Sequence, residues 1–380
     1  MPIALSIKEQ ELFEKAKDFS ISNFASEKVG WQDNGTPFKD AIKIFSDHGY
    51  CGLGLPMELG GQGYNYLEQA LIYEGLAYGC GVLSFLIETH NNITMEIGIF
   101  YDASDEVVEL IPDMATGKNI NAFALTEENS GSDPSSITSY ATLETDGYHI
   151  HGNKVWIANA AEAGHFNVMV KDGSPKSNNI LMLLIDRNTP GLTVGKQKPI
   201  MGLSAMSCCD LELNDCIVSK NRLLSDQGYK EALRAIDVAR IFVPAIAIGI
   251  AQRVIDLTVS YLGQRISFKK PIISRQAVQW MLADLSTKVE AGRWLVYKTA
   301  SLMDSNVTIS IQAAKNKLYA TEVAMETTTQ CLQLFGAQGY AENSVLSKNW
   351  SLAKILQIVD GTSEIQKIVI GRDLEKHAIA

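Results

Sequence analysis

Residues 121–136, NAFALTEENSGSDPSS, mark the point where the sequence changes from one kind of secondary structure to another. Before residue 121, apolar positions recur at helical spacing, as in EQELFEKAKDFSISNFA and YLEQALIYEGLAYG. After it come short segments of alternating apolar and polar residues, separated by Asp-Gly and Asn-Thr-Pro-Gly turns. The stretch therefore predicts that a β domain begins here, after a helical one.

The rest of the chain completes the order helix, strand, helix. The strand pattern ends near residue 225, and long helical runs return from YKEALRAIDVARIFVPAIAIGIAQ onwards. We expect an α+β protein with an N-terminal helical domain (1–120), a middle β domain (121–225) and a C-terminal helical domain (226–380). A chain of 380 residues is long enough to bury a large core in this arrangement.

Composition limits the functions that the chain can have. Its 33 basic and 43 acidic residues give a formal net charge of −10, which disfavours nucleic acid or an anionic membrane as the main partner. We expect no membrane span of about 20 apolar residues, and the N-terminus lacks the pattern of a signal peptide. Six cysteines without a CxxC pair or a zinc spacing predict core thiols in a cytoplasmic protein, with no metal centre.

Residues 358–366, IVDGTSEIQ, lie between two predicted helices. Asp360 and Gly361 form a turn dipeptide, because glycine tolerates positive φ and aspartate bonds its own backbone. Ser363 and Gln366 have the spacing of a capping box, which would start the following helix. On local grounds the stretch is therefore a turn before a helix, and a chemical role for Asp360 needs support from elsewhere in the chain.

Five motifs, in order, supply that support: FALTEENSGSDPSS (123–136), KVWIAN (154–159), RISFKKPIISRQAVQ (265–279), QLFGAQGY (333–340) and DGTSEIQ (360–366). With them the chain resembles the acyl-CoA dehydrogenase family over nearly all of its 380 residues. The resemblance implies two helical domains around a β barrel, with FAD held between domains and partly by a neighbouring subunit. It also implies a homodimer or homotetramer.

The resemblance further implies the reaction, in which a thioester becomes its α,β-enoyl form. A base removes the α proton while hydride leaves the β carbon for flavin N5, so the cofactor supplies the acceptor and the protein supplies orientation and the base. A backbone N–H at the base residue and a flavin hydroxyl polarise the thioester carbonyl, as in an oxyanion hole. Asp360 stands at the position of the base.

The resemblance also assigns the other site residues. The candidate cofactor-binding residues are Phe123, Leu125, Thr126, Ser132, Trp156, Ala158, Arg265, Phe268, Gln276, Gln333, Gly336, Thr362 and Glu364, of which Gln333 and Gly336 would serve the neighbouring subunit; the candidate substrate-binding residues are His90, Arg240 and Gly361. Ordinary structural interpretations stay open beside these. They are a strand end and turn for 123–132, core packing for Trp156 and His90, and helix capping for Arg265, Thr362 and Glu364.

Several positions depart from the family pattern, and three of them bear directly on the chemistry. The usual base is glutamate, and Asp360 is shorter by one methylene. In some subfamilies the glutamate precedes the residue that matches Arg240, but that position holds Ala239. Ala158 replaces the Thr or Ser whose hydroxyl bonds flavin N5, which should alter the reactivity of the flavin with oxygen.

These departures leave several functions open. The first is an FAD-dependent dehydrogenase of an acyl thioester, on CoA or on an acyl carrier protein, with an electron-transfer flavoprotein as a possible electron acceptor. The second is a flavin-dependent oxidase or monooxygenase on the same fold, which Ala158 motivates. The third is a flavin-free scaffold, which the set Arg265, Gln333 and Thr362 disfavours.

Overall fold

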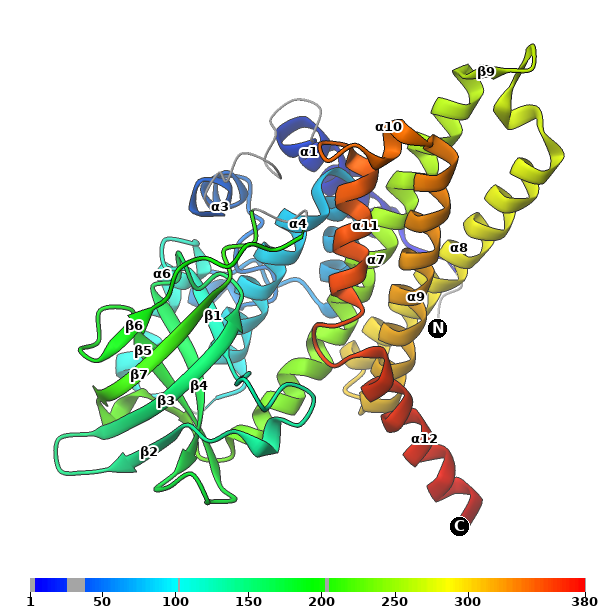
Figure 1. Ribbon diagram of the computed structural model, residues 1–380. Coiled ribbons are helices and arrows are strands. Elements are labelled where there is room, and N and C mark those ends of the chain that lie inside the picture. Colours follow the sequence, from blue (N-terminus) through cyan, green and yellow to red (C-terminus); the bar gives the residue numbers. More distant parts are fainter. Residues whose placement is uncertain (1–3, 26–37, 102, 202–204, 380) are drawn as a thin grey trace.

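The computed structural model describes residues 4–25, 38–101, 103–201 and 205–379, and it has the expected order of helices, strands and helices (Figure 1). The N-terminal helices are α1 (Ile7–Phe24), α3 (Phe38–Asp47), α4 (Tyr66–Ile99), α5 (Asp105–Val108) and α6 (Ile111–Ala115). α4 begins with a capping box, in which Asn65 Oδ1 accepts from the Glu68 N–H at 2.8 Å and Glu68 Oε2 accepts from the Asn65 N–H at 3.1 Å. The cap satisfies N–H groups that the first helical turn leaves unpaired.

Eight strands of the middle region form one curved mixed sheet (Figure 1). They are β1 (Asn121–Ala124), β2 (Tyr140–Leu143), β3 (Tyr148–Ile157), β4 (His165–Asp172), β5 (Ile180–Asp186), β6 (Leu192–Val194), β7 (Cys209–Val218) and β8 (Leu223–Ser225). The strand order is β6-β7-β3-β2-β4-β5-β8, and β1 pairs in parallel with β4. β4 and β5 are buried on both faces, because one face fills the interior of the curved sheet and the other packs against the N-terminal helices.

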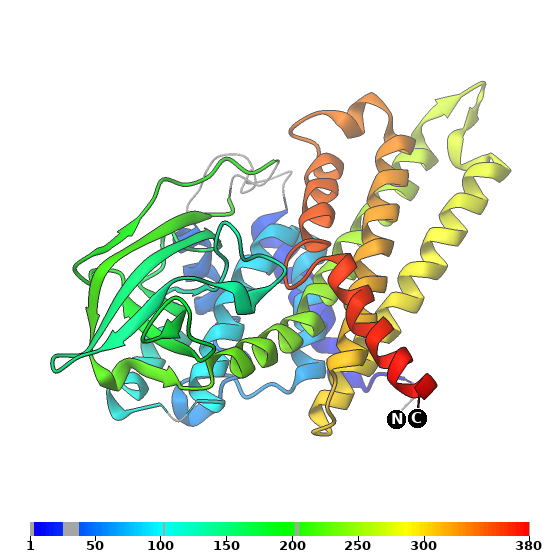
Figure 2. The ribbon, with the colours of Figure 1, turned by 60° about the horizontal axis from the view of Figure 1, so that its bottom comes forward.

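The C-terminal region is a helical bundle. Its helices are α7 (Gly228–Gln264), α8 (Gln276–Asp304), α9 (Ser310–Phe335), α10 (Ala337–Tyr340), α11 (Val345–Leu356) and α12 (Ser363–Ile379), and a hairpin of β9 (Ile266–Ser267) and β10 (Lys270–Pro271) joins α7 to α8. Short 3₁₀ turns lie at Met57–Leu59 (η1), Pro134–Ser136 (η2), Lys220–Arg222 (η3) and Ile272–Ser274 (η4). Figures 1 and 2 both place the β9 hairpin at the end of the bundle that is far from the sheet.

α4 and α7 are the central helices of the fold. Each contacts the other along its length, and α4 also contacts β1 while α7 contacts β5 and β8. Both are long and apolar enough to cross a membrane, with mean hydropathies of 1.6 and 1.7, so the expectation that no segment has this character was wrong. Of those apolar windows, 94% and 89% are buried inside the fold, which is the behaviour of core helices. All six cysteines are buried and none forms a disulfide, as expected.

Candidate active site

Asp360 lies on the turn between α11 and α12, at the point where both helices meet α7 and α9. Its φ is +53° and that of Gly361 is +92°, so the backbone is left-handed at both residues. Aspartate and glycine are the residues that tolerate this conformation best. The local turn prediction is therefore confirmed.

Three buried side chains from other positions hold this turn by its carbonyl oxygens. Arg240 on α7 donates from Nε to the Asp360 carbonyl at 3.0 Å. Lys317 on α9 donates from Nζ to the Gln357 carbonyl at 2.9 Å and to the Gly361 carbonyl at 2.8 Å. The Gln366 amide donates to the Gly361 carbonyl at 2.7 Å and more weakly to that of Asp360 at 3.3 Å. Because these donors converge on the carbonyls of one turn, the backbone that carries the Asp360 side chain and N–H is held in one orientation.

Gly361 has a steric reason to be glycine. A Cβ atom there would lie 2.8 Å from Gln366 Nε2 and 2.9 Å from Arg240 Nη2. Any side chain would therefore displace two of the groups that hold the turn. The role of substrate contact that the sequence suggested for Gly361 stays a prediction, while its role in close packing is explained by these distances.

The Asp360 carboxyl is suited to accept a proton. Burial raises its pKa, and the positive charges of Lys317 and Arg240 oppose that rise. A carboxyl with a raised pKa is a stronger base near neutral pH than an exposed one. Among the described residues, no oxygen accepts a hydrogen bond from the Asp360 N–H, so this donor is available beside the carboxylate.

Helix α12 begins differently from the capping box that the sequence suggested. Thr362 is the cap, because its Oγ1 accepts from the Ile365 N–H at 3.4 Å and the helix begins at Ser363. The Ser363 hydroxyl instead donates to Glu322 on α9 at 2.7 Å. The predicted pairing of Ser363 with Gln366 was wrong, since Ser363 bonds Glu322 on α9 and the Gln366 amide bonds the carbonyls of the preceding turn. Glu364 is exposed on the first turn of α12, near the positive end of the helix dipole.

Trp156 projects from the sheet at a β-bulge. The register of β3 against β7 shifts between Lys154 and Ile157, and Trp156 has a φ of +61°. This conformation is unfavourable for a bulky residue, and the Asp210 carboxylate stabilises it by accepting from the Trp156 N–H at 3.0 Å. The indole is 59% exposed rather than part of the core. A strained, exposed tryptophan is better explained by a ligand than by packing.

Of the remaining candidates of the β domain, Thr126 is joined to the bulge of Trp156 by a hydrogen bond. The Thr126 carbonyl accepts from the Val155 N–H at 2.9 Å, which joins the end of the β1 segment to the bulge. Phe123, Leu125 and Thr126 are partly exposed, and Ser132 is exposed in the turn that follows. Ala158 is partly exposed in the turn after β3. Phe123 and Leu125 also pack against the apolar cluster between the sheet and the N-terminal helices.

A second group of candidates lies at the far end of the bundle. The rings of Tyr261 and Phe335 stack with centroids 4.3 Å apart, which joins the end of α7 to the end of α9. Arg265 follows the first of these helices and Gly336 the second, while Gln276 begins α8; all three are exposed.

Phe268 belongs to this second group. It and Lys269 form the two-residue loop of the β9–β10 hairpin, with φ values of +47° and +67°. Glycine or asparagine is usual at such positions, and the Phe268 side chain is 91% exposed. A positive φ and an exposed aromatic ring are both unfavourable in an isolated chain, so this hairpin indicates contact with something outside the chain.

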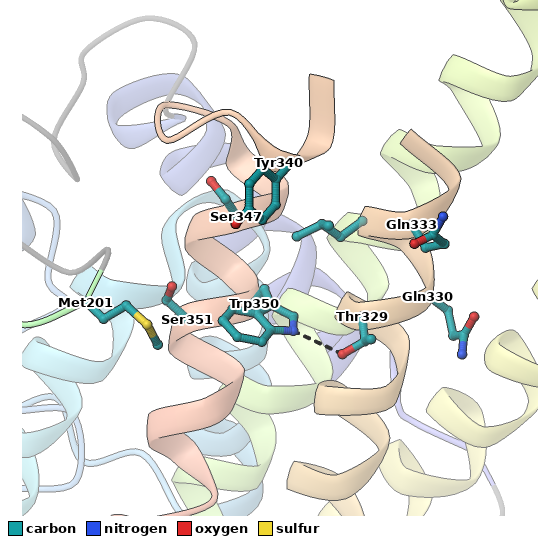
Figure 3. A pocket seen from close by; sticks show the side chains of 9 residues that line it. Met201, Thr329, Gln330, Gln333, Tyr340, Ser347, Trp350 and Ser351 are labelled. Carbon is teal, nitrogen blue, oxygen red and sulfur yellow. Dashed lines mark hydrogen bonds between the residues drawn. The ribbon is translucent and has the colours of Figure 1, made fainter. Parts of the chain in front are cut away.

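A cavity of ≈470 Å³ lies beside the second group, between α9, α10 and α11 (Figure 3). Gln333, Tyr340 and Met201 are among the residues that line it. The Trp350 indole N–H donates to Thr329 Oγ1 at 3.1 Å across its base. Gln333 therefore lies at the edge of a space that a ligand or a neighbouring chain can enter.

Two predicted substrate contacts have structural partners instead. His90 is fully buried, with Nε2 donating to the Met114 carbonyl at 3.0 Å and Nδ1 accepting from the Asn121 N–H at 3.1 Å. Burial lowers the pKa of His90 to about 4, so the ring is neutral and has no nitrogen left for a ligand. This corrects the substrate-binding assignment in favour of a core histidine. Arg240 holds Asp360 and pairs with Asp237 at 3.0 Å, so it positions the turn.

Sequence reasoning missed Lys317, which holds the turn at Asp360. Its one signal is a charged residue on a helix face that otherwise carries small side chains, among them Ala313, Ala314, Ala320 and Thr321. A lysine is almost never fully buried unless it is paired, so its position on this face was informative.

The fold and this site together define a flavoprotein oxidoreductase of the CH–CH class. The chain belongs to the acyl-CoA dehydrogenase family: the N-terminal, middle and C-terminal domains of that family match residues 6–118, 122–216 and 226–375. The sequence-based recognition of the family and of its fold is confirmed.

Relatives and solved structures agree with this assignment. The acryloyl-CoA reductase (NADH) of Anaerotignum propionicum is 34% identical over 340 residues, which are 88% of this chain and 86% of the relative. A probable acyl-CoA dehydrogenase of Bacillus subtilis is 32% identical over 99% of this chain and 100% of its own. Butyryl-CoA dehydrogenase of Megasphaera elsdenii superposes with a TM-score of 0.90 at 29% identity, covering 98% of this chain and 100% of that one. The prolyl acyl carrier protein oxidase AnaB superposes with a TM-score of 0.91 at 25% identity and the same coverage.

Proposed function

We propose that this chain oxidises the α,β bond of an acyl thioester, with Asp360 as the base and FAD as the hydride acceptor. The observation that carries the proposal is the turn itself. It presents a carboxylate of raised pKa and, from the same residue, an N–H with no acceptor in the part of the chain that the structure describes, and three buried side chains fix the geometry of the turn. Ala239 provides no carboxylate at the other position where the family places a base.

In this reaction the Asp360 carboxylate accepts the α proton of the substrate. The α proton of a thioester is only weakly acidic, so its removal requires that negative charge on the carbonyl oxygen be stabilised. The Asp360 N–H donates a hydrogen bond to that oxygen. Arg240 and Lys317 keep the turn in place and lower the cost of the ionised carboxylate, so that it is available as a base.

The residues present fit FAD. An exposed indole on a strained bulge, an exposed Phe268 and an exposed Arg265 are the aromatic and cationic groups that a flavin, an adenine and a diphosphate require. Phe123, Leu125, Thr126, Ser132 and Ala158 would border the flavin ring with Trp156, and Thr362 and Glu364 would lie at its helix-terminal side. When bound, FAD supplies the electron acceptor for the hydride that leaves the β carbon.

One chain does not bring all these residues together. The group around Trp156 lies on the sheet, and the group of Arg265, Phe268, Gln276, Gln333 and Gly336 lies at the far end of the bundle (Figures 1 and 2). We therefore place each FAD between two copies of the chain, with the sheet of one and the bundle end of the other. A homodimer or homotetramer follows from this arrangement.

The thioester carrier and the electron acceptor belong to the same proposal. Relatives are described as enzymes of CoA thioesters, whereas AnaB is described as an oxidase of a carrier-protein thioester. A solved structure 31% identical to this chain is described as an electron-transferring flavoprotein of Acidaminococcus fermentans, which favours such a protein as the acceptor. Comparing one acyl group on CoA and on an acyl carrier protein distinguishes the two carriers.

An oxidase is the second candidate, because Ala158 has no hydroxyl to donate toward the flavin. Reoxidation of the reduced protein in air, with formation of hydrogen peroxide, would support the oxidase. Slow reoxidation in air and fast reoxidation by an electron-transferring flavoprotein would support the dehydrogenase.

Anaerobic bleaching of the bound flavin by an acyl thioester tests the proposal. Asp360→Asn should slow bleaching by about 10²–10⁴-fold, since a general base contributes that much. Asp284→Asn, an exposed aspartate on α8, is the matched control and should bleach at the wild-type rate. Equal rates for Asp360→Asn and the wild type would show that Asp360 is not the base.

A further inference from the structure

Helix α4 carries three polar side chains in a column that the mechanism above does not use. Glu88, Asn92 and Glu96 are spaced by four residues, so they lie on one face over successive turns. They are only 2%, 7% and 2% exposed. Eight residues of helix extend about 12 Å, so the column is as long as a medium acyl chain.

Each member of the column has an oxygen without a hydrogen-bond partner among the described residues. These atoms are Glu88 Oε1, Asn92 Oδ1 and Glu96 Oε1. The contacts that exist use other atoms: Asn92 Nδ2 donates to the Ala235 carbonyl at 3.5 Å, and Tyr101 donates to Glu96 Oε2 at 3.1 Å. Buried acceptors are normally paired, so three unpaired ones in a row require an explanation.

The Glu88 end of the column is the end on which the charge of Asp360 acts more strongly. Burial, and after it the charge of Asp360, raises the pKa of Glu88 well above its ordinary range. For Glu96 the charges of Arg234 and Glu231 come before that of Asp360, so Glu96 is at the outer end. The contact from Asn92 to Ala235 shows that the column faces α7, the helix whose Arg240 holds Asp360. An acyl group that reacts at Asp360 would therefore extend along Glu88, Asn92 and Glu96.

The ionisable side chains along the column toward Asp360 are acidic. Arg234 is occupied at the outer end, where its guanidinium lies 3.5 Å from the centroid of the Phe100 ring and 3.8 Å from Glu231. Burial raises the pKa of Glu96 to about 8, which shows that its environment disfavours further negative charge. A hydrocarbon chain would leave all three oxygens unpaired, whereas an ammonium group offers donors to the oxygens that it reaches and a positive charge to the carboxyl groups.

We propose that the acyl group of the substrate carries an amine, and that the buried oxygens of Glu88, Asn92 and Glu96 select for it, with the nearest of them accepting its hydrogen bonds. The inference rests on the proposed function only for the orientation of the thioester toward Asp360. Glu88 and Glu96 are specificity-determining residues in this account, and they take no part in proton transfer from the α carbon.

The test uses two ligands of nearly equal shape that cannot be oxidised. S-heptyl pantetheine and S-(6-aminohexyl) pantetheine differ by the replacement of a terminal methyl group with an ammonium. Titration calorimetry with the FAD-loaded wild-type protein should give a Kd at least tenfold lower for the amine. Equal binding, or tighter binding of the heptyl ligand, would overturn the proposal and show that the three polar side chains do not recognise the ligand.

Variants show whether the column causes the preference. Glu88→Gln and Glu96→Gln keep the side-chain shape, and each should reduce the preference for the amine by at least threefold. Glu109→Gln changes an exposed carboxylate near the end of α5 and should leave the preference unchanged. A preference that survives in the Glu88→Gln/Glu96→Gln double variant would also overturn the proposal.

A separate measurement distinguishes this inference from the proposed function. Anaerobic bleaching with S-(6-aminohexanoyl) pantetheine reports oxidation, while the calorimetric preference reports recognition. Preference without bleaching would refute the oxidation and leave the amine recognition standing. Bleaching without a preference for the amine would refute the amine recognition and leave the oxidation standing.

Discussion

Lys317→Met is the most informative single change, because the structure gives Lys317 two effects of opposite sign. The ammonium group is fully buried and donates to the carbonyls on both sides of Asp360, at 2.9 Å and 2.8 Å. It is also the larger of the two positive charges that oppose the rise in the pKa of Asp360. Methionine keeps a similar length and removes both the donors and the charge.

The effect on stability should be modest. Two hydrogen bonds from a charged donor contribute about 3–6 kcal/mol together. Burial lowers the pKa of Lys317 from 10.5 to about 8, and a displacement of that size costs the charged form about 3.4 kcal/mol. Methionine loses the hydrogen bonds but avoids the cost of burying the charge. The free energy of unfolding should therefore fall by no more than about 3 kcal/mol.

The effect of the substitution on the pKa of Asp360 should be larger. A nearby opposite charge lowers the pKa of a carboxyl by about 1–3 pH units. Removing it therefore raises the pKa of Asp360 further, and a base must be ionised to act. The acid limb of the kcat/KM profile should accordingly lie at higher pH in Lys317→Met than in the wild type, by about one pH unit or more.

The assay is the pH dependence of flavin bleaching by an acyl thioester, alongside urea unfolding of the same preparations. Lys315→Met, an exposed lysine two residues away on α9, is the control and should keep the wild-type profile. The reasoning is refuted by a folded Lys317→Met protein whose acid limb coincides with that of the wild type.

The other predictions concern the turn, the flavin face and the core. Gly361→Ala places a Cβ 2.9 Å from Arg240 Nη2 at a φ of +92°, and should lower stability by about 1–3 kcal/mol in urea unfolding and also slow bleaching; an unchanged midpoint would contradict the close packing. Asp210→Ala removes the acceptor of the Trp156 N–H and should weaken FAD binding by about fivefold in a fluorescence titration, whereas unchanged affinity would mean that the bulge holds without it. Glu74→Ala removes a buried carboxylate that accepts from Arg293 Nε at 2.8 Å and from the Tyr297 hydroxyl at 2.7 Å, and should cost about 2–4 kcal/mol of stability, with no effect on the apparent thioester affinity of the protein that remains folded.

Much of the fold follows from local patterns in the sequence. The change at residue 121 from helical spacing to alternation identified the β domain, because each periodicity reflects which face an element buries. The Asp360–Gly361 turn was equally local, since the two residues supply the positive φ that it needs. The family motifs named Trp156, but its strained conformation comes from the register shift between β3 and β7, which no local pattern specifies.

Sequence alone determined the order of the domains, the turn and the residue types available for chemistry. Tertiary structure alone decided what surrounds Asp360. Lys317 and Arg240 reach its turn from positions 43 and 120 residues away in the chain, and the partner of a hydrogen bond at such a separation has no local signature. In the same way the spacing of Glu88, Asn92 and Glu96 can be read from α4, but their burial exists only because α7 packs against that face and excludes water from it.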